Sequence, residues 1–168
     1  MISDDHIRMM ARYNRWQNEA LYAAANTLDG AARDMDCGAF WGSITGTLSH
    51  LLWGDTIWMS RFDGGPRPDV AMPDSAAFAS NWADLCAKRL EMDDRIEAWA
   101  KTVGDVPSDQ TFKYLPSGAQ VEQTKPLALC ITHFFNHQTH HRGQIHAMLT
   151  AAGAATSATD LVLMPDAG

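Results

Sequence analysis

The chain has 168 residues, of which 46% are hydrophobic, so it is long enough to bury a core, and we expect residues 1–168 to form a single domain. Its formal net charge of −7 argues against nucleic acids and anionic membranes as partners, because both are bound through basic surface. The three cysteines are too few for a disulfide framework, and no apolar run approaches the ~20 residues of a membrane helix.

The first predicted element is a helix that begins at Ser3–Asp5, where a serine or aspartate can cap it, and runs to about Leu28. Asp29-Gly30 ends it. Apolar residues lie on two of its sides, which is typical of a helix with two neighbours in a bundle. Asn14 and Gln17 interrupt one apolar stripe and indicate a buried polar network near one end of the bundle.

The second helix is predicted over Phe40–Phe62, before a Gly- and Pro-rich break at residues 64–68. Within it, we interpret Asp55 as a solvated or arginine-paired carboxylate. Ser75 is the predicted N-cap of a third helix, whose apolar residues follow a four-three rhythm. That seam consists of Phe78, Trp82, Leu85, Arg89, Met92, Ile96 and Trp99. Arg89 either extends its head to water or holds a substrate carboxylate.

A crossover separates this helix from the last one. Thr111–Leu115 and Gln120–Thr124 flank a turn sequence and predict a short hairpin. The fourth helix is predicted from Pro126 to Leu149, because proline suits a first helical turn. The tail contains one apolar segment, Leu161–Met164, which predicts a final turn or a capping strand. The expected architecture is all-α, a four-helix bundle with a long crossover, containing the hairpin, before the last helix.

The N-terminus and the cysteines indicate the cellular compartment. Residues 1–6 are acidic where a signal peptide would be basic, and no apolar segment follows them. Cys37, Cys86 and Cys130 are far apart in the sequence, and we interpret Cys130 as a small buried hydrophobic residue. We therefore expect a soluble, reduced, cytoplasmic protein.

Histidines are concentrated in the last helix, where five of the seven lie between residues 133 and 146. His133, His137 and His141 recur every fourth residue and so line one helix face. His137 and His141 lie about 6 Å apart along the axis and can reach one metal ion together. His133 lies about 12 Å from His141 along the axis, too far for all three to share an ion.

The third ligand must therefore come from another helix. His50 lies in the middle of the second helix, whereas His6 lies in an N-terminal turn that frays, so His50 is the better candidate. His140 and His146 are expected at the surface or in packing. Gln144 could line the site and bond a ligand imidazole, or make an ordinary polar contact.

The segment His137–Gln144 resembles the signature of the DinB/YfiT-like superfamily of DNA-damage-inducible bacterial proteins. Tyr13–Trp16, His50, Trp53–Asp55 and Trp58 fit the same pattern. The resemblance implies a four-helix bundle, often dimeric, that binds one divalent metal through three histidines. Matched residue by residue, these are His50, His137 and His141. The family name refers to induction by DNA damage and implies no DNA-binding activity.

Three neutral imidazoles leave a coordination position open, as in catalytic metal sites, and a thiol or water bound there would ionise. The superfamily resembled here includes thiol-dependent S-transferases and isomerases. Gln138 stands where HExxH metalloproteases place glutamate, which argues against protease-like hydrolysis.

We therefore expect a metal-dependent thiol S-transferase or hydrolase that acts on a small electrophilic substrate, with Gln144 supporting the ligands. The alternatives are a non-catalytic metal-binding stress-response or assembly protein, and a helical bundle with incidental histidines. The expected metal is a divalent transition metal, Zn or Ni first, with Fe, Mn or Cu as further candidates; imidazole suits Zn, Ni, Cu and Fe alike. The expected partners are a small molecule such as a low-molecular-weight thiol and a second copy in a homodimer, with no nucleic acid and no membrane.

Overall fold

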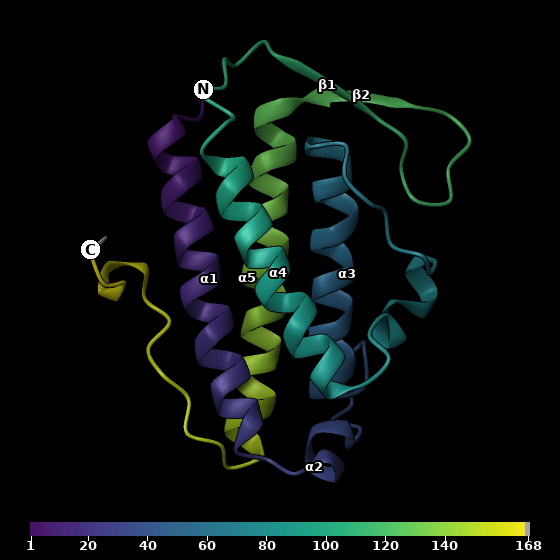
Figure 1. Ribbon diagram of the computed structural model, residues 1–168, viewed down its shortest axis with the longest axis vertical. Coiled ribbons are helices and arrows are strands. Elements are labelled where there is room, and N and C mark those ends of the chain that lie inside the picture. Colours follow the sequence, from purple (N-terminus) through teal and green to yellow (C-terminus); the bar gives the residue numbers. More distant parts are fainter. Residues whose placement is uncertain (167–168) are drawn as a thin grey trace.

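Four long helices packed side by side make up most of the computed structural model, which describes residues 1–166 (Figure 1). They are α1 (Asp4–Asn26), α3 (Ile44–Phe62), α4 (Trp82–Ala100) and α5 (Leu127–Ala151). Helices α1 and α3 each pack against both α4 and α5, so every helix has two neighbours. The predicted four-helix architecture with a hairpin before the last helix is confirmed. None of the described helices is both long and apolar enough to cross a membrane.

The starts of two helices differ from the prediction because of their caps. Helix α3 begins at Ile44 rather than Phe40, since Gly42 has a positive φ of 74° and the Ser43 side chain accepts from the backbone N–H of Gly46. The short helix α2 (Gly30–Asp34), which precedes it, was not predicted.

Ser75 was wrongly predicted as the N-cap of the third helix. It lies inside a 3₁₀ helix, η1 (Met72–Ala77), which packs against α3. Helix α4 starts at Trp82, and the Asn81 side chain caps it by accepting from the backbone N–H of Asp84. Its predicted seam is confirmed from Leu85 onward, where the apolar positions and Arg89 are buried.

A two-stranded antiparallel hairpin connects α4 to α5 across one end of the bundle (Figure 1). Its strands are β1 (Thr111–Tyr114) and β2 (Gln123–Pro126), with Tyr114 opposite Gln123. The second strand therefore starts three residues later than predicted, which lengthens the connecting loop. Because β2 extends to Pro126, this residue is the N-cap of α5 rather than its first residue.

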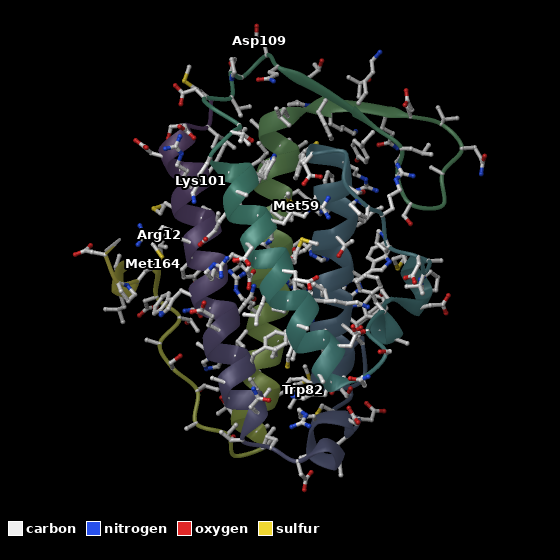
Figure 2. All side chains as sticks on the ribbon, viewed as in Figure 1. Arg12, Met59, Trp82, Lys101, Asp109 and Met164 are labelled. Atoms are coloured by element: carbon white, nitrogen blue, oxygen red, sulfur yellow. The ribbon has the colours of Figure 1, made fainter. Side chains whose placement is uncertain are left out.

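The C-terminal tail runs beside α1 and ends in a 3₁₀ turn, η2 (Leu161–Leu163), so the predicted final turn is confirmed (Figure 1). The Gln17 amide donates to the carbonyl of Ala158, and Arg12 donates to that of Pro165. Arg12 and Met164 lie together at this edge of the bundle in Figure 2. Gln17 thus fastens the tail instead of joining a network inside the bundle.

Most of the interior of the bundle is apolar, but a cluster of charged side chains is buried in it. Cys130 is buried, as predicted, among residues of this core. Arg89 is only 2% exposed, so the expectation that its head reaches water was wrong. Its Nη1 donates to Asp55 Oδ2 at 2.6 Å, and its Nη2 lies 2.9 Å from Asp93 Oδ1. Asp55 is therefore the arginine-paired carboxylate of the two alternatives, and both charges are inside the bundle.

This cluster also connects α1 and α5. The Asn14 amide donates to Asp93 Oδ1 at 3.3 Å, and Arg142 donates to Asn14 Oδ1. Gln138 Nε2 donates to Asp55 Oδ1 at 3.0 Å. The buried polar network predicted from Asn14 is confirmed, and it links all four long helices. Its predicted position near one end of the bundle was wrong, because Asn14 lies in the middle of α1 and its partners lie in the middle of the other helices. Because this hydrogen bond joins Gln138 to α3, it fixes which face of α5 is turned toward α3. It does so at the residue that follows His137.

Candidate metal centre

His50 of α3 and His137 and His141 of α5 come together where the two helices pack. One nitrogen of each ring can be chosen so that all three lie within 4.8 Å of one another. The ring centroids are 5.4 Å apart for His50 and His137, 4.7 Å for His50 and His141, and 4.5 Å for His137 and His141. His50 and His141 are buried and His137 is partly buried. The structure thus forms the cluster expected from the sequence, and such a cluster could hold a metal ion.

Two of the rings are oriented by a hydrogen bond through Nδ1. His50 Nδ1 lies 2.8 Å from Ser75 Oγ, and the indole of Trp41 stacks on the His50 ring at 3.8 Å between centroids. His141 Nδ1 lies 2.8 Å from Gln144 Oε1. When each Nδ1–H donates to its oxygen, Nε2 keeps a lone pair for a metal. The Gln144 oxygen only accepts, so it selects this tautomer of His141, and the Ser75 hydroxyl, which can accept or donate, is placed to accept from the same tautomer of His50.

The third ring, His137, lies directly over Gly54. A Cβ atom added at Gly54 would lie 2.5 Å from His137 Cε1 and 3.1 Å from its Nδ1. These distances are shorter than van der Waals contact, so only glycine leaves room for the ring in this position. The backbone of α3 thus forms the floor on which His137 rests.

All three imidazoles are neutral near pH 7. Burial is the main cause, and it lowers the pKa of His50 to about 4 and that of His137 to about 3. The charge that His141 would carry lowers both values further. Burial also lowers the pKa of His141 itself. A divalent transition metal binds the neutral form of imidazole, through the same lone pair that a proton would occupy. Three neutral imidazoles close together therefore fit such a metal.

The other histidines lie outside this group. His133 is exposed, and its ring centroid lies 6.0 Å from that of His137. His140 is exposed beside His141, and His146 Nε2 lies 3.1 Å from Thr156 Oγ1. His6 is exposed near the start of α1. The structure thus brings together the three residues chosen from the sequence and leaves the other four apart from them.

Ser75, Trp41 and the role of Gly54 were not found by sequence reasoning. Ser75 was assigned to a helix cap, and no local pattern links it to a histidine 25 residues away. Trp41 was placed inside a helix that in fact begins after it. Gly54 belongs to a segment already quoted for the family resemblance, which was the one available signal.

The family model described as "DinB family" matches residues 3–167, almost the whole chain. The chain belongs to the DinB family. Among curated proteins, Protein DinB of Bacillus subtilis (strain 168) is 27% identical over 164 residues, and the match covers 88% of this chain and 87% of that protein. No solved structure matches the chain significantly. The resemblance drawn from the histidine-rich segment is therefore confirmed, as a distant homology to B. subtilis DinB.

Proposed function

We propose that this DinB-family protein binds one divalent transition metal ion, zinc or nickel first, through His50, His137 and His141. We further propose that it acts as a metal-dependent enzyme, a thiol S-transferase or hydrolase that works on a small electrophilic substrate. The observation that carries the proposal is the convergence of three neutral imidazole nitrogens within 4.8 Å from two helices.

The make-up of the cluster supports catalysis rather than a purely structural site. Among residues 1–166, no fourth histidine, cysteine or carboxylate joins the group. Structural zinc sites are usually closed by four protein ligands, whereas catalytic sites keep a position open. A divalent metal with an open position lowers the pKa of a bound thiol or water and so supplies a nucleophile near neutral pH.

The residues around the cluster would keep its geometry fixed. Ser75 and Gln144 hold two rings by their Nδ1 atoms, and Trp41 covers one face of His50. Gly54 gives His137 the space it needs. Rings held in place on rigid helices lose little entropy when they bind an ion. We also propose that the protein acts as a homodimer and that its thiol is a low-molecular-weight one.

A non-catalytic metal-binding or assembly role is the second candidate, and the burial of His50 and His141 favours it. A metal enclosed by these rings would cross-link α3 and α5 and stabilise the bundle, without admitting a substrate. Binding of a small thiol separates the two roles. In an enzyme site the thiol should bind to the metal and change the spectrum of that metal, whereas a metal in a closed site should bind no thiol.

Metal content of untagged purified protein, measured by inductively coupled plasma mass spectrometry, tests the ligand set. We expect about one equivalent of metal in the wild type and in His133→Ala, and loss of the metal in His137→Ala. His133 is the matched control because it lies on the same helix face, one turn away. Equal loss in both variants would refute the ligand assignment. A screen of the metal-loaded protein with several thiols and electrophiles then tests the enzymatic role.

A further inference from the structure

A cavity of about 260 Å³ lies between α1 and α4, away from the histidine cluster between α3 and α5. Its buried lining residues form the floor, and they are Asn18, Tyr22, Arg89 and Asp93. Its exposed lining residues form the mouth and include Glu19, Ala23 and Leu90. The volume is just below the roughly 300–1,000 Å³ of typical ligand pockets, so an occupant must be a small molecule.

Four polar atoms on the floor residues make no hydrogen bond within residues 1–166, and almost none of their surface is open to water. They are Arg89 Nε, Asp93 Oδ2, Asn18 Oδ1 and the Tyr22 hydroxyl oxygen. Other atoms of these side chains hold them in place, since Asn18 Nδ2 donates to Asp93 Oδ1 at 2.9 Å. Arg89 Nη1 donates to Asp55 Oδ2 at 2.6 Å. A buried polar atom without a hydrogen bond costs stability, so four at the floor of one cavity indicate a binding site.

The wall at Tyr22 is also held in place. The Tyr22 ring stacks on that of Trp82, with 5.6 Å between centroids, and the Trp82 indole N–H donates to Asn26 Oδ1 at 2.8 Å. The guanidinium carbon of Arg33 lies 4.4 Å from the centroid of the Trp82 ring. Trp82 is labelled in Figure 2, at the start of α4. A ligand therefore meets a wall that loses little freedom on binding.

The charges beneath the cavity favour a neutral occupant. Two buried arginines, Arg89 and Arg142, balance two buried carboxylates, Asp55 and Asp93. Arg142 stays charged near pH 7, because burial lowers its pKa only to about 10. Tyr22 is uncharged, because burial raises the pKa of its hydroxyl. A bound carboxylate or ammonium would add a charge without a partner to this balanced interior, which is costly.

A primary carboxamide offers a partner to each of the four atoms. Its carbonyl oxygen has two lone pairs, which can accept from Arg89 Nε–H and from the Tyr22 hydroxyl. Its NH₂ group has two N–H bonds, which can donate to Asp93 Oδ2 and Asn18 Oδ1. A carboxylate has no hydrogen for these two oxygens, and an ammonium has no lone pair for Arg89. Either ion therefore leaves at least one of the four atoms unpaired.

We propose that the cavity between α1 and α4 binds a small neutral molecule through a primary carboxamide group seated on Asn18, Tyr22, Arg89 and Asp93. The rest of the molecule lies toward the mouth, where Ala23 and Leu90 offer apolar contacts. The site uses no residue of the histidine cluster and needs no metal ion, so it is independent of the proposed enzymatic function.

Water filling the cavity is the competing explanation, because water also donates and accepts hydrogen bonds and occupies polar cavities. Titration of ¹⁵N-labelled protein with benzamide, benzoate and benzylamine, followed by NMR chemical shifts, separates the two. The three probes share a phenyl ring and differ in the polar group. Benzamide should bind about tenfold more tightly than either ion and shift resonances of the floor residues. Equal affinities, or no shifts at the floor, would overturn the carboxamide site.

Tyr22→Phe is the sharpest variant, because it removes only a hydroxyl that makes no hydrogen bond in the protein. It should leave the melting temperature unchanged or raise it slightly, and weaken benzamide binding by about three- to tenfold. Tyr13→Phe is the matched control on the same helix, since its hydroxyl donates to the carbonyl of Thr159 and it does not line the cavity. It should leave the benzamide affinity unchanged. Wild-type benzamide affinity in Tyr22→Phe would overturn the proposed contacts.

His137→Ala keeps this test separate from the test of the metal centre. The variant should bind benzamide as the wild type does, whether or not the protein takes up metal. Loss of benzamide binding in His137→Ala would show that the probe binds at the histidine cluster, and would overturn the site between α1 and α4.

Discussion

Gly54→Ala tests whether the floor beneath His137 controls metal binding. The new Cβ would lie 2.5 Å from His137 Cε1, whereas two carbon atoms in contact lie about 3.5–4 Å apart. The ring must therefore move by about 1 Å. Metal–nitrogen distances tolerate only about 0.2 Å. We expect the metal affinity to fall by about ten- to a hundredfold, the range seen when the support of a ligand is removed.

The same substitution should change the stability of the metal-free protein much less. Without an ion the ring is free to swing aside, and alanine stabilises a helix interior by up to about 1 kcal/mol relative to glycine. The effect should thus appear in metal binding and not in folding. Competition with a chromophoric chelator measures the affinity, and urea unfolding of the chelated protein measures the stability.

Gly143→Ala in α5 is the matched control, because nothing lies within 4 Å of a Cβ built there. It should leave the metal affinity unchanged and stabilise the protein by about 1 kcal/mol or less. Wild-type metal affinity in Gly54→Ala would show that His137 is not a ligand in the observed position, and would refute the reasoning.

Two further predictions concern the buried charges. The site histidines have pKa values lowered from 6.5, two of them to about 4 and about 3, so below pH 6.5 the unfolded chain binds protons that the folded chain does not. The free energy of unfolding of chelated protein should fall from pH 7 to pH 5, by at most about 1.4 kcal/mol per pH unit for each imidazole; urea unfolding measures this, and a flat profile would contradict it. Arg89→Met leaves Asp55 and Asp93 buried without a counter-charge and should cost about 3–5 kcal/mol in urea unfolding. Arg95→Met, which removes a partly exposed partner of Asp63, should cost less than about 1 kcal/mol, and equal costs would contradict the assignment of the first pair as buried.

Much of the helical framework could be predicted because its signals are local. The four-three rhythm of the segment ending at Trp99 and the four-residue spacing of His137 and His141 follow from the helical repeat. Helix starts were predicted less well. Ser75 is a suitable cap by type, yet its side chain pairs with His50 instead, because tertiary contacts compete with local capping.

His50 was chosen from the sequence by elimination as the third candidate ligand, and the packing of α3 against α5 places it with His137 and His141. Its surroundings could not be predicted in the same way. The turn before α3 brings Trp41 to the cluster, and the 3₁₀ helix brings Ser75. The close approach of α3 and α5 brings Gly54 to it. None of these contacts repeats with a period that a sequence can display.

By itself the sequence determined that helices form and that α5 presents two imidazoles on one face. Only the tertiary structure decided which oxygen lies beside Nδ1 of His50 and of His141, and that Arg89 is enclosed by two carboxylates. The physical reason is the separation along the sequence over which each effect acts. Helical periodicity acts over a few residues, whereas hydrogen bonds and burial depend on atoms that only the folded chain brings together.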